Sequence, residues 1–379
     1  MLEGPRAPHE KEFTHVLEFL NQTLRSHGTH SLSQVSNNSE QNWSIAEEYP
    51  TALNTSNLAN IRIITENDHI LSHAVLKPMI IKSPYINFKV GAIGSVVTEE
   101  SSRNQGFSKK IIQNCLDSAK SQDCDIAVLW TDIPDFYRKL GFELAGSEIS
   151  FTIHQEFTPP EHPYELRFLD SIKVSPDALL KLFNTHTVGS VRTSEEIRKF
   201  LKIPNTRLYT AWDPQNQLVA YAVEGKGADL SGYIHEWGGS TKGLLNLLSW
   251  IRIKKQTHFT IILPLHSLNL MGQLMKIKAQ YNQGFLGMIK IVNEESFFIK
   301  IKKAAAARGV PNLILHKKES GYEFGLPKFT IQCKDEKELV SLLFGPNDIL
   351  EKNYFPSEAA RTLNQAFPLD FWIWGWDSI

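Results

Sequence analysis

Residues 94–110 read Gly-Ser-Val-Val-Thr-Glu-Glu-Ser-Ser-Arg-Asn-Gln-Gly-Phe-Ser-Lys-Lys. This stretch begins as a β-rich run, passes through a loop of the form Arg-x-x-Gly-x-Ser centred on Gly106, and continues into an amphipathic helix. Such a loop can aim several backbone N–H groups at one anion, and the positive end of the helix dipole adds to the attraction. Because Gly106 permits close backbone approach and Arg103 adds a charged donor, the stretch predicts a pyrophosphate site.

The composition is that of an ordinary globular protein. The chain has 379 residues, a formal net charge of −1 and a pI near 6.9. This length exceeds the size at which single cores stop growing, so we expect two or three domains. The lack of a basic surplus argues against nucleic acid as a partner. We find neither an apolar signal core at the N-terminus nor a run of about 18 apolar residues, and we therefore expect a cytoplasmic protein with no membrane association.

Cysteine usage points to no special chemistry. The three cysteines, Cys115, Cys124 and Cys333, cannot all pair and show no metal-ligand spacing. We expect reduced, structural thiols and no metal site. Cys115 and Cys124 lie in an apolar helix face and before an apolar strand, so neither has the surroundings of an activated nucleophile.

The same order of elements occurs twice in the chain. Each copy is predicted to contain a β-hairpin, a third strand, a helix and a fourth strand. The first copy has strands at 61–66, 70–76, 91–98 and 126–130, and the second has strands at 208–212, 218–223, 233–237 and 259–263. Strand, helix and strand in this order predict a parallel pair with a right-handed crossover. The second copy lacks the arginine-bearing loop, so only the first is expected to bind the anion.

Changes of pattern predict the domain boundaries. Residues 155–166 contain Pro159, Pro160 and Pro163 and are typical of a linker. After residue 284 a smaller α+β unit is expected, with strands near 288–292 and 329–333 and helices near 337–343 and 357–366. The predicted domains are 1–158, 159–283 and 284–379. Residues 26–42 are rich in Ser, His, Asn and Gln and are expected to form an exposed loop.

The first copy resembles the GCN5-related N-acetyltransferase (GNAT) superfamily. The signature of that superfamily at this junction is Gln/Arg-x-x-Gly-x-Gly/Ala, which Arg103, Gly106 and Ser108 match with a small residue at the last position. A second match follows, because residues 135–143, Asp-Phe-Tyr-Arg-Lys-Leu-Gly-Phe-Glu, resemble its Tyr-x-x-x-Gly-Phe segment. The resemblance implies an α/β (α+β) fold with two tandem GNAT domains built on mixed twisted sheets.

The complete layout is similar to the enhanced intracellular survival (Eis) type of bacterial acetyltransferase. In that type a catalytic GNAT domain, a degenerate second GNAT domain and a sterol-carrier-protein-like domain follow one another. Residues 342–345, Leu-Leu-Phe-Gly, and the Ala-Phe-Pro-Leu-Asp run at 366–370 carry the resemblance of the third domain. The resemblance also implies a homo-oligomer, with a hexamer as its expected form.

The resemblance assigns roles to the first domain. Acetyl-CoA is implied as co-substrate, with its acetyl group passing directly to a small-molecule or peptide amine without an acyl-enzyme. Tyr137 occupies the position of the general acid, and a phenol of pKa ~10 is protonated at neutral pH. The residues implied to bind acetyl-CoA are Val96, Val97, Thr98, Arg103, Asn104, Gln105, Gly106, Phe107 and Ser108.

The base and the acceptor site are less defined by motifs. The chain ends in Phe-Trp-Ile-Trp-Gly-Trp-Asp-Ser-Ile, residues 371–379, which is too apolar to be left in water, so we expect it to dock. The Eis resemblance implies that the terminal carboxylate of Ile379 acts in the active site, with Asp377 as a side-chain alternative. Trp43, Glu47 and Glu48 are candidate acceptor-binding residues, with a half-buried structural face as the alternative.

Two further alternatives stay open. His235 and Glu236 resemble an acid/base pair, but neighbours on a strand point to opposite faces, which favours structural roles. The whole chain could instead be a non-catalytic CoA-binding sensor or scaffold whose third domain binds an apolar molecule.

Overall fold

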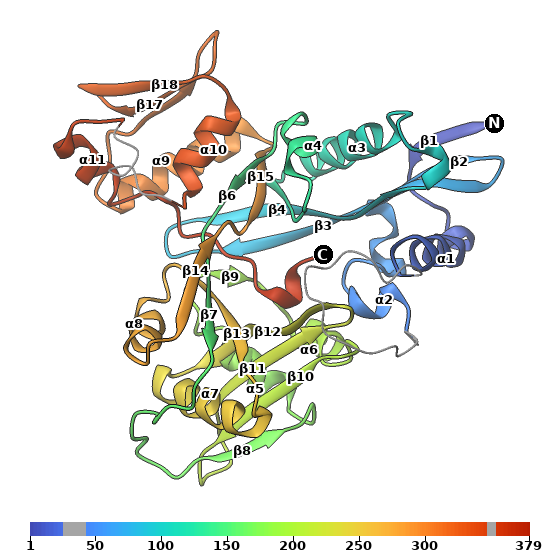
Figure 1. The fold of residues 1–379 in the computed structure, drawn as a ribbon. Helices are drawn as coiled ribbons and strands as arrows, with labels where there is room; N and C mark the ends of the chain where they lie inside the picture. Colours follow the sequence, from blue (N-terminus) through green and yellow to red (C-terminus); the bar gives the residue numbers. More distant parts are fainter. Residues whose placement is uncertain (26–42, 347–353) are drawn as a thin grey trace.

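The structure, a computed structural model, describes residues 1–25, 43–346 and 354–379. The loop predicted at 26–42 lies outside these described residues. The chain has a mixed α/β fold built on two large sheets and one three-stranded sheet. Figure 1 shows the first sheet above the second, with the C-terminus between them.

The first sheet contains eight strands. Its order is β1-β2-β3-β4-β5-β15-β6, with the short β9 paired to β3. β4 and β5 run parallel, with α3 as the crossover, which confirms the predicted strand-helix-strand unit. The strands are β1 (Leu2–Arg6), β2 (Ile61–Glu66), β3 (His69–Lys82), β4 (Asn87–Thr98), β5 (Ile126–Leu129), β6 (Glu143–Ala145), β9 (Gly189–Ser190) and β15 (Gly287–Ile291).

The second sheet repeats this plan. Its order is β14-β7-β13-β12-β11-β10-β8, and β12 and β13 form the predicted second parallel pair around α7. The strands are β7 (Glu148–Ile153), β8 (Arg167–Asp170), β10 (Arg207–Trp212), β11 (Leu218–Lys226), β12 (Asp229–Gly239), β13 (Phe259–Pro264) and β14 (Gln280–Gly284). No regular element occurs between β7 and β8, as expected for the linker at 155–166.

Helices cover both sheets, and a buried stripe explains the placement of α3. Phe107, Ile111, Cys115 and Ala119 recur at helical spacing and are buried in one cluster with residues of β3 and β4. The helices are α1 (Phe13–Leu24), α2 (Ile45–Glu48), α3 (Phe107–Ser121), α4 (Pro134–Arg138), α5 (Pro176–Phe183), α6 (Ser194–Phe200), α7 (Thr241–Lys255), α8 (Leu268–Lys276), α9 (Glu294–Ala307), α10 (Glu336–Phe344) and α11 (Ser357–Leu363).

The two large sheets exchange strands across the predicted boundaries. β6 belongs to the first sheet, but β7, which follows it directly, pairs with β13 and β14 in the second. Conversely, β15 pairs with β5 and β6 in the first sheet, although β14 lies in the second. The prediction that the strand near 288–292 belongs to the third unit was therefore wrong. Four of the five residues of β15 are buried, as suits a strand between two others.

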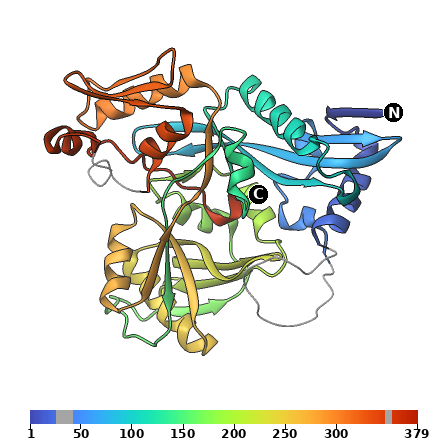
Figure 2. The ribbon, with the colours of Figure 1, turned by 45° about the horizontal axis from the view of Figure 1, so that its top comes forward.

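The third unit is a smaller α+β layer. It contains the antiparallel strands β16 (Ile314–Lys317), β17 (Tyr322–Leu326) and β18 (Phe329–Cys333), together with α9, α10 and α11. Figure 2 shows it at the end of the first sheet opposite the N-terminus. Aromatic packing joins it to that sheet. The ring centroid of Phe88 in β4 lies 6.1 Å from that of Phe297 in α9 and 6.0 Å from that of Phe344 in α10.

Candidate active site

The loop before α3 has the geometry of an anion cradle. Gly106 is the N-cap residue of α3, with φ +80°, and a Cβ at this position would meet no atom within 4 Å. The first backbone N–H bonded within the helix is that of Lys110, which donates to the Gly106 carbonyl at 3.1 Å. In the described part of the chain, the N–H groups of residues 104–109 donate to no carbonyl and are available to an anion.

Arg103 lies at the mouth of this loop. Its side chain is 58% exposed and makes a 3.7 Å ion pair with Glu100. A surface pair of this length contributes little to stability. The guanidinium is therefore accessible to a phosphate, because its weak ion pair with Glu100 does not neutralise it.

A gap opens between β4 and β5 beside the loop. The two strands pair only at Val90–Ile126, Gly91–Ala127 and Ala92–Val128, and β4 then continues to Thr98 without β5. The pairing of β4 with β3 also slips between Val75–Gly94 and His73–Val97, where Ser95 has φ +48°. Such a bulge re-aims the backbone next to a site. The predicted residues Val96, Val97 and Thr98 lie directly after it.

His73 holds the bulge in place. Its Nδ1 donates to the Ser95 carbonyl at 2.8 Å, and burial lowers the pKa of His73 to about 4, so the ring is neutral at pH 7. The motifs did not indicate this residue, because it lies in the middle of an ordinary-looking strand. Its only sequence signal is a histidine within an apolar run.

A chain of hydroxyl groups links the loop to the strands. Thr98 Oγ1 lies 2.8 Å from Ser108 Oγ and 2.8 Å from Ser72 Oγ. Ser108, in the last position of the motif, therefore makes a side-chain hydrogen bond that Gly or Ala could not make. It ties the start of α3 to the end of β4.

Tyr137 lies in an aromatic cluster on α4. It is buried, 7% exposed, with Phe136 and Phe142 packed edge-on at 5.0 and 6.1 Å between ring centroids. Burial, and to a smaller extent the charge of Asp132, raise the pKa of Tyr137 to about 12. The phenol stays protonated over the neutral range.

The C-terminus docks against the other face of the sheet. A Cβ on Gly94 would lie 2.6 Å from the carboxyl carbon of Ile379, so the terminal carboxylate is in direct contact with β4 at the residue before Ser95. Tyr137 packs with Val96, whereas Ile379 packs with Val97. The two predicted catalytic groups therefore approach the bulge from opposite faces of the sheet and belong to different packing clusters.

Ile379 lines a cavity of about 430 Å³ between the two large sheets. Its walls include Trp130 at the end of β5, Tyr49 after α2 and residues of β12. The acidic and aromatic side chains lining it are Glu148, Asp229, Tyr49, Trp130, Tyr233 and Trp372. With the terminal carboxylate, three acidic groups and four aromatic rings surround one space, which suits a cationic molecule.

Glu148 is the acidic group that sequence reasoning missed. It lies at the start of β7, and burial raises the pKa of its carboxyl to about 7. In the described chain we find no hydrogen bond or ion pair of its side chain. A carboxyl that is desolvated and lacks a cation is a frequent mark of a functional site. The exchange of β7 into the second sheet brings it here, which no local pattern indicates.

The predicted acceptor residues have structural contacts. Glu47 completes a capping box at the start of α2. Glu48 is fully buried and binds Arg25 with both carboxylate oxygens, at 3.0 and 2.7 Å. It also accepts a hydrogen bond of 2.9 Å from Trp43 Nε1. The residue of this segment that lines the cavity is Tyr49.

The structure also shows the surroundings of the cysteines, of His235 and Glu236, and of Asp377. Burial raises the pKa of Cys115 to about 12 and that of Cys124 to about 11, which is unfavourable for a nucleophile. His235 and Glu236 do not form a pair, because His235 lines the cavity and Glu236 binds Arg192. Asp377 is also bound to Arg192, so it is not a free base. The described residues contain no group of three metal-binding side chains.

Comparisons with known proteins agree with this geometry. Residues 5–145 match a family model described as acetyltransferase (GNAT) domain. A search of curated proteins finds no match. A GCN5-related N-acetyltransferase from Anabaena variabilis aligns over 100% of both chains, with a TM-score of 0.65 and 17% identity. A probable N-acyltransferase from Enterococcus faecalis covers 97% of both chains (TM-score 0.64, 14% identity), and Eis1 from Mycobacterium abscessus covers 100% of both (TM-score 0.60, 12% identity).

The match to this family model indicates the class of protein. Residues 5–145 form a GNAT acetyltransferase domain, and the chain is an acyltransferase. The solved structures share its fold across the whole length. Within the ranges that the structure describes, no helix has the length and apolar character of a transmembrane segment.

The loop geometry makes a direct prediction. Replacing Gly106 by Val is expected to raise the Kd for acetyl-CoA about 10- to 100-fold, the equivalent of one lost charge-assisted hydrogen bond. The added side chain would project into the open space beside the loop. Gly232→Val is a matched control, because Gly232 has φ +79° and equally open surroundings. Isothermal titration with acetyl-CoA measures both; equal effects would assign the loss to backbone strain alone.

Proposed function

We propose that the chain transfers the acetyl group of acetyl-CoA directly to an amine bound in the cavity beside Ile379. The observation that carries the proposal is the opening beside β4, which has an anion loop at one end and a carboxylate-lined cavity at the other. A donor with a pyrophosphate and an acceptor with a positive charge would meet at the bulge. The loop 103–108 would hold the pyrophosphate, and the backbone of Val96, Val97 and Thr98 would hold the pantetheine arm.

The residues around the bulge supply the proton chemistry. An amine attacks only when neutral, so a proton must leave it, and a second proton must reach the departing thiolate. The Ile379 carboxylate, which touches β4 at Gly94, would accept the first proton directly or through water. Tyr137, on the other face, would donate the second. Glu148 would attract the ammonium form of the amine into the cavity.

Thiol release from acetyl-CoA tests this function. Polyamines, aminoglycosides and lysine peptides are offered in turn, and mass spectrometry checks the amine for an added acetyl group. We expect thiol release that depends on at least one amine. Tight CoA binding without turnover on any of them would contradict the proposal and support the sensor alternative.

Glu148 predicts a pH dependence. Its neutral form attracts no cation, so kcat/KM is expected to rise with pH through about 7, the pKa to which burial brings this carboxyl. In Glu148→Gln this rise of kcat/KM with pH should disappear, and kcat/KM at pH 8 should fall about 10- to 100-fold. Glu156→Gln, an exposed change of the same charge, is the control. If kcat/KM of Glu148→Gln still rises with pH near 7, another group is responsible for the rise.

The same group affects stability. The pKa of Glu148 is raised in the folded protein from 4.5, so between pH 4.5 and about 7 the folded state holds a proton that the unfolded chain releases. Its contribution therefore becomes less favourable as pH rises through this window.

Other parts of the Eis resemblance remain proposals. A cytoplasmic location, a homohexamer and a sterol-carrier-like third domain are proposed, the last two on sequence resemblance. The α+β make-up of the third unit is compatible with the last. Mass photometry of the full chain measures the oligomeric state, and a single species other than six chains would contradict the hexamer.

A further inference from the structure

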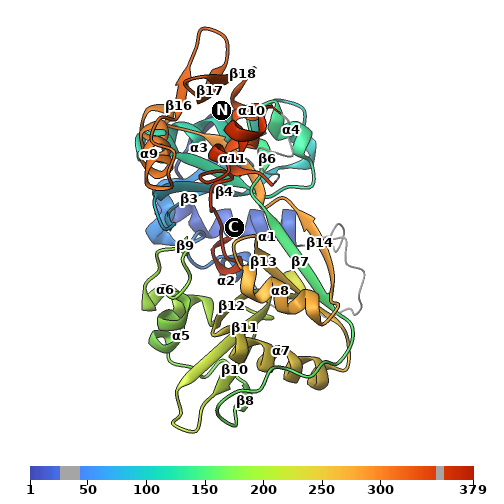
Figure 3. The same cartoon turned by 90° about the vertical axis from the view of Figure 1, so that its left-hand side faces the viewer.

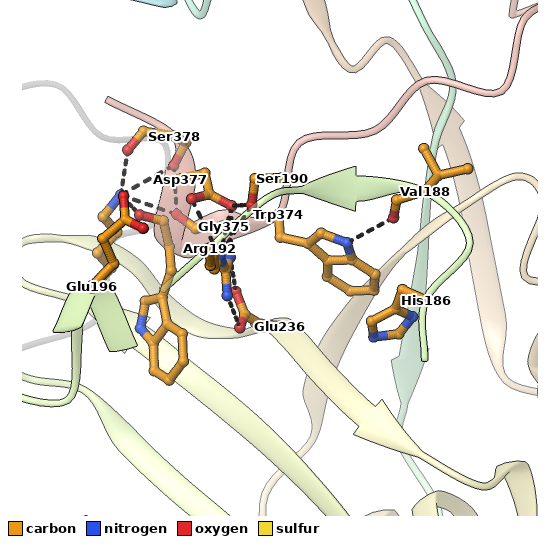
Figure 4. Close-up of polar contacts among 12 residues, drawn as sticks. His186, Val188, Ser190, Arg192, Glu196, Glu236, Trp374, Gly375, Asp377 and Ser378 are labelled. Atoms are coloured by element: carbon orange, nitrogen blue, oxygen red, sulfur yellow. Dashed lines mark hydrogen bonds and ion pairs between the residues drawn. The ribbon is translucent and has the colours of Figure 1, made fainter. Parts of the chain in front are cut away.

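The last turn of the chain is held by buried charges of the second sheet. Arg192, which follows β9, binds Glu236 of β12 through two hydrogen bonds of 2.6 and 2.8 Å. It also binds the Asp377 carboxylate, with a contact of 2.6 Å from its NH2 group. Figure 4 shows Arg192 between these two carboxylates. Its guanidinium carbon lies 3.8 Å above the ring centre of Phe183, and its side chain is 1% exposed.

A buried lysine holds the backbone of the same turn. Lys226, at the end of β11, is 1% exposed. Its Nζ donates to the carbonyls of Gly375 at 3.0 Å and Trp376 at 3.4 Å, and also to that of Ser378. The Ser378 carbonyl belongs to the peptide bond that leads into Ile379. The ammonium thus acts one residue away from the terminal carboxylate.

Further contacts hold the tail on this surface. Trp374 Nε1 donates to the Val188 carbonyl at 3.2 Å, and the ring of Trp376 stacks on Phe200 at 5.6 Å. A Cβ on Gly375 would lie 2.1 Å from His235 Nδ1, so the backbone passes in close contact with β12. Immediately after this fixed segment, the carboxyl group of Ile379 contacts Gly94 of the first sheet.

We infer that Arg192 and Lys226 are positioning residues for acetyl transfer, because they fix the last turn of the chain so that the terminal carboxylate is presented to β4. The inference rests on the proposed function. It gives the second sheet, which lacks an anion loop of its own, a role in the reaction of the first. Figure 3 shows the C-terminus between the two sheets.

Burying the charges of Arg192 and Lys226 costs desolvation free energy, so docking of the tail alone does not explain them. Apolar packing of the three tryptophans would suffice for docking, and buried ion pairs often add little net stability. Charged groups, however, define one geometry, since each carbonyl and carboxylate oxygen must meet its donor. Such a defined geometry can affect the reaction rate, because a catalytic group must be held within a fraction of an ångström of its productive position.

Lys226→Met tests the inference, with Lys255→Met as a matched control. Lys255 is a part-buried lysine of α7 that binds Glu224, and among the described residues we find no hydrogen bond or ion pair between it and the tail. We expect Lys226→Met to lower kcat at least tenfold, to leave the Kd for acetyl-CoA within twofold, and to speed release of Ile379 by a carboxypeptidase at least tenfold. The control should change none of these.

Combination with a tail extension separates positioning from general stability. If Lys226 acts only through the carboxylate, adding one residue after Ile379 in the Lys226→Met protein should bring kcat no lower than the same extension does in the wild-type chain. Losses that multiply, or a released tail with unchanged kcat, would overturn the inference. An extension without effect in the wild-type chain would instead contradict the catalytic carboxylate of the proposed function.

A second variant covers the case in which Lys226→Met does not fold. Asp377→Ala changes the tail itself and leaves Arg192 paired with Glu236. We expect the same pattern of lower kcat, unchanged acetyl-CoA affinity and faster carboxypeptidase release. A folded Asp377→Ala protein with wild-type kcat would also overturn the inference.

Discussion

Appending one glycine after Ile379 is expected to lower kcat about 100-fold or more, the range in which general acid–base groups act. The carboxylate touches β4, where even a Cβ on Gly94 would lie 2.6 Å from its carbon. There is no room for another residue between the tail and the strand, so the extension must displace the carboxylate. Steady-state kinetics with a saturating amine measures the loss.

Two companion variants define what the extension removes. Deleting Ile379 moves the carboxylate to Ser378, ~3.8 Å back along the chain, and should cost about as much as the extension. Ile379→Leu keeps the carboxylate at the chain end and should retain most of the activity. If the extended protein turns over at the wild-type rate, the tail is a structural cover and the base lies elsewhere.

Local features of the site could be predicted from the sequence. The run from Gly94 to Lys110 predicts strand, loop and helix because each depends on neighbouring residues: the β-rich run, Gly106 at a positive φ, and apolar residues at helical spacing. The doubled pattern likewise predicts both parallel pairs, since a strand, a helix and a strand form one compact unit. The crowded aromatic tail predicts that the C-terminus docks.

Features that depend on distant pairing could not be predicted. β7 and β15 are ordinary apolar strands, and nothing in their residues says which of two similar sheets they enter. That choice places Glu148 in the cavity. Lys226 and Arg192 are single charges within a strand and a loop, so their burial against the tail becomes visible only in three dimensions. Glu48 is the converse case, because a residue type that suits a ligand is already paired with Arg25 in the structure.

Tyr137→Phe is expected to lower kcat about 100- to 10,000-fold while the Kd for acetyl-CoA stays within about twofold. The ring packs between Phe136 and Phe142, and these contacts survive the loss of one oxygen atom. The variant therefore removes the proton donor and little else. Because burial raises the pKa of Tyr137 to about 12, the wild-type rate should show no loss from ionisation of this phenol below about pH 10.

A second tyrosine provides the control for the missing oxygen. Tyr322 is 5% exposed in the third unit, and its hydroxyl binds Glu294 at 2.5 Å. Tyr322→Phe should leave kcat unchanged, with any effect confined to thermal stability. The decisive comparison is a single-turnover experiment with bound acetyl-CoA, in which chemistry is separated from product release. An unchanged single-turnover rate in Tyr137→Phe would remove Tyr137 as the acid and leave water as the proton donor to the thiolate.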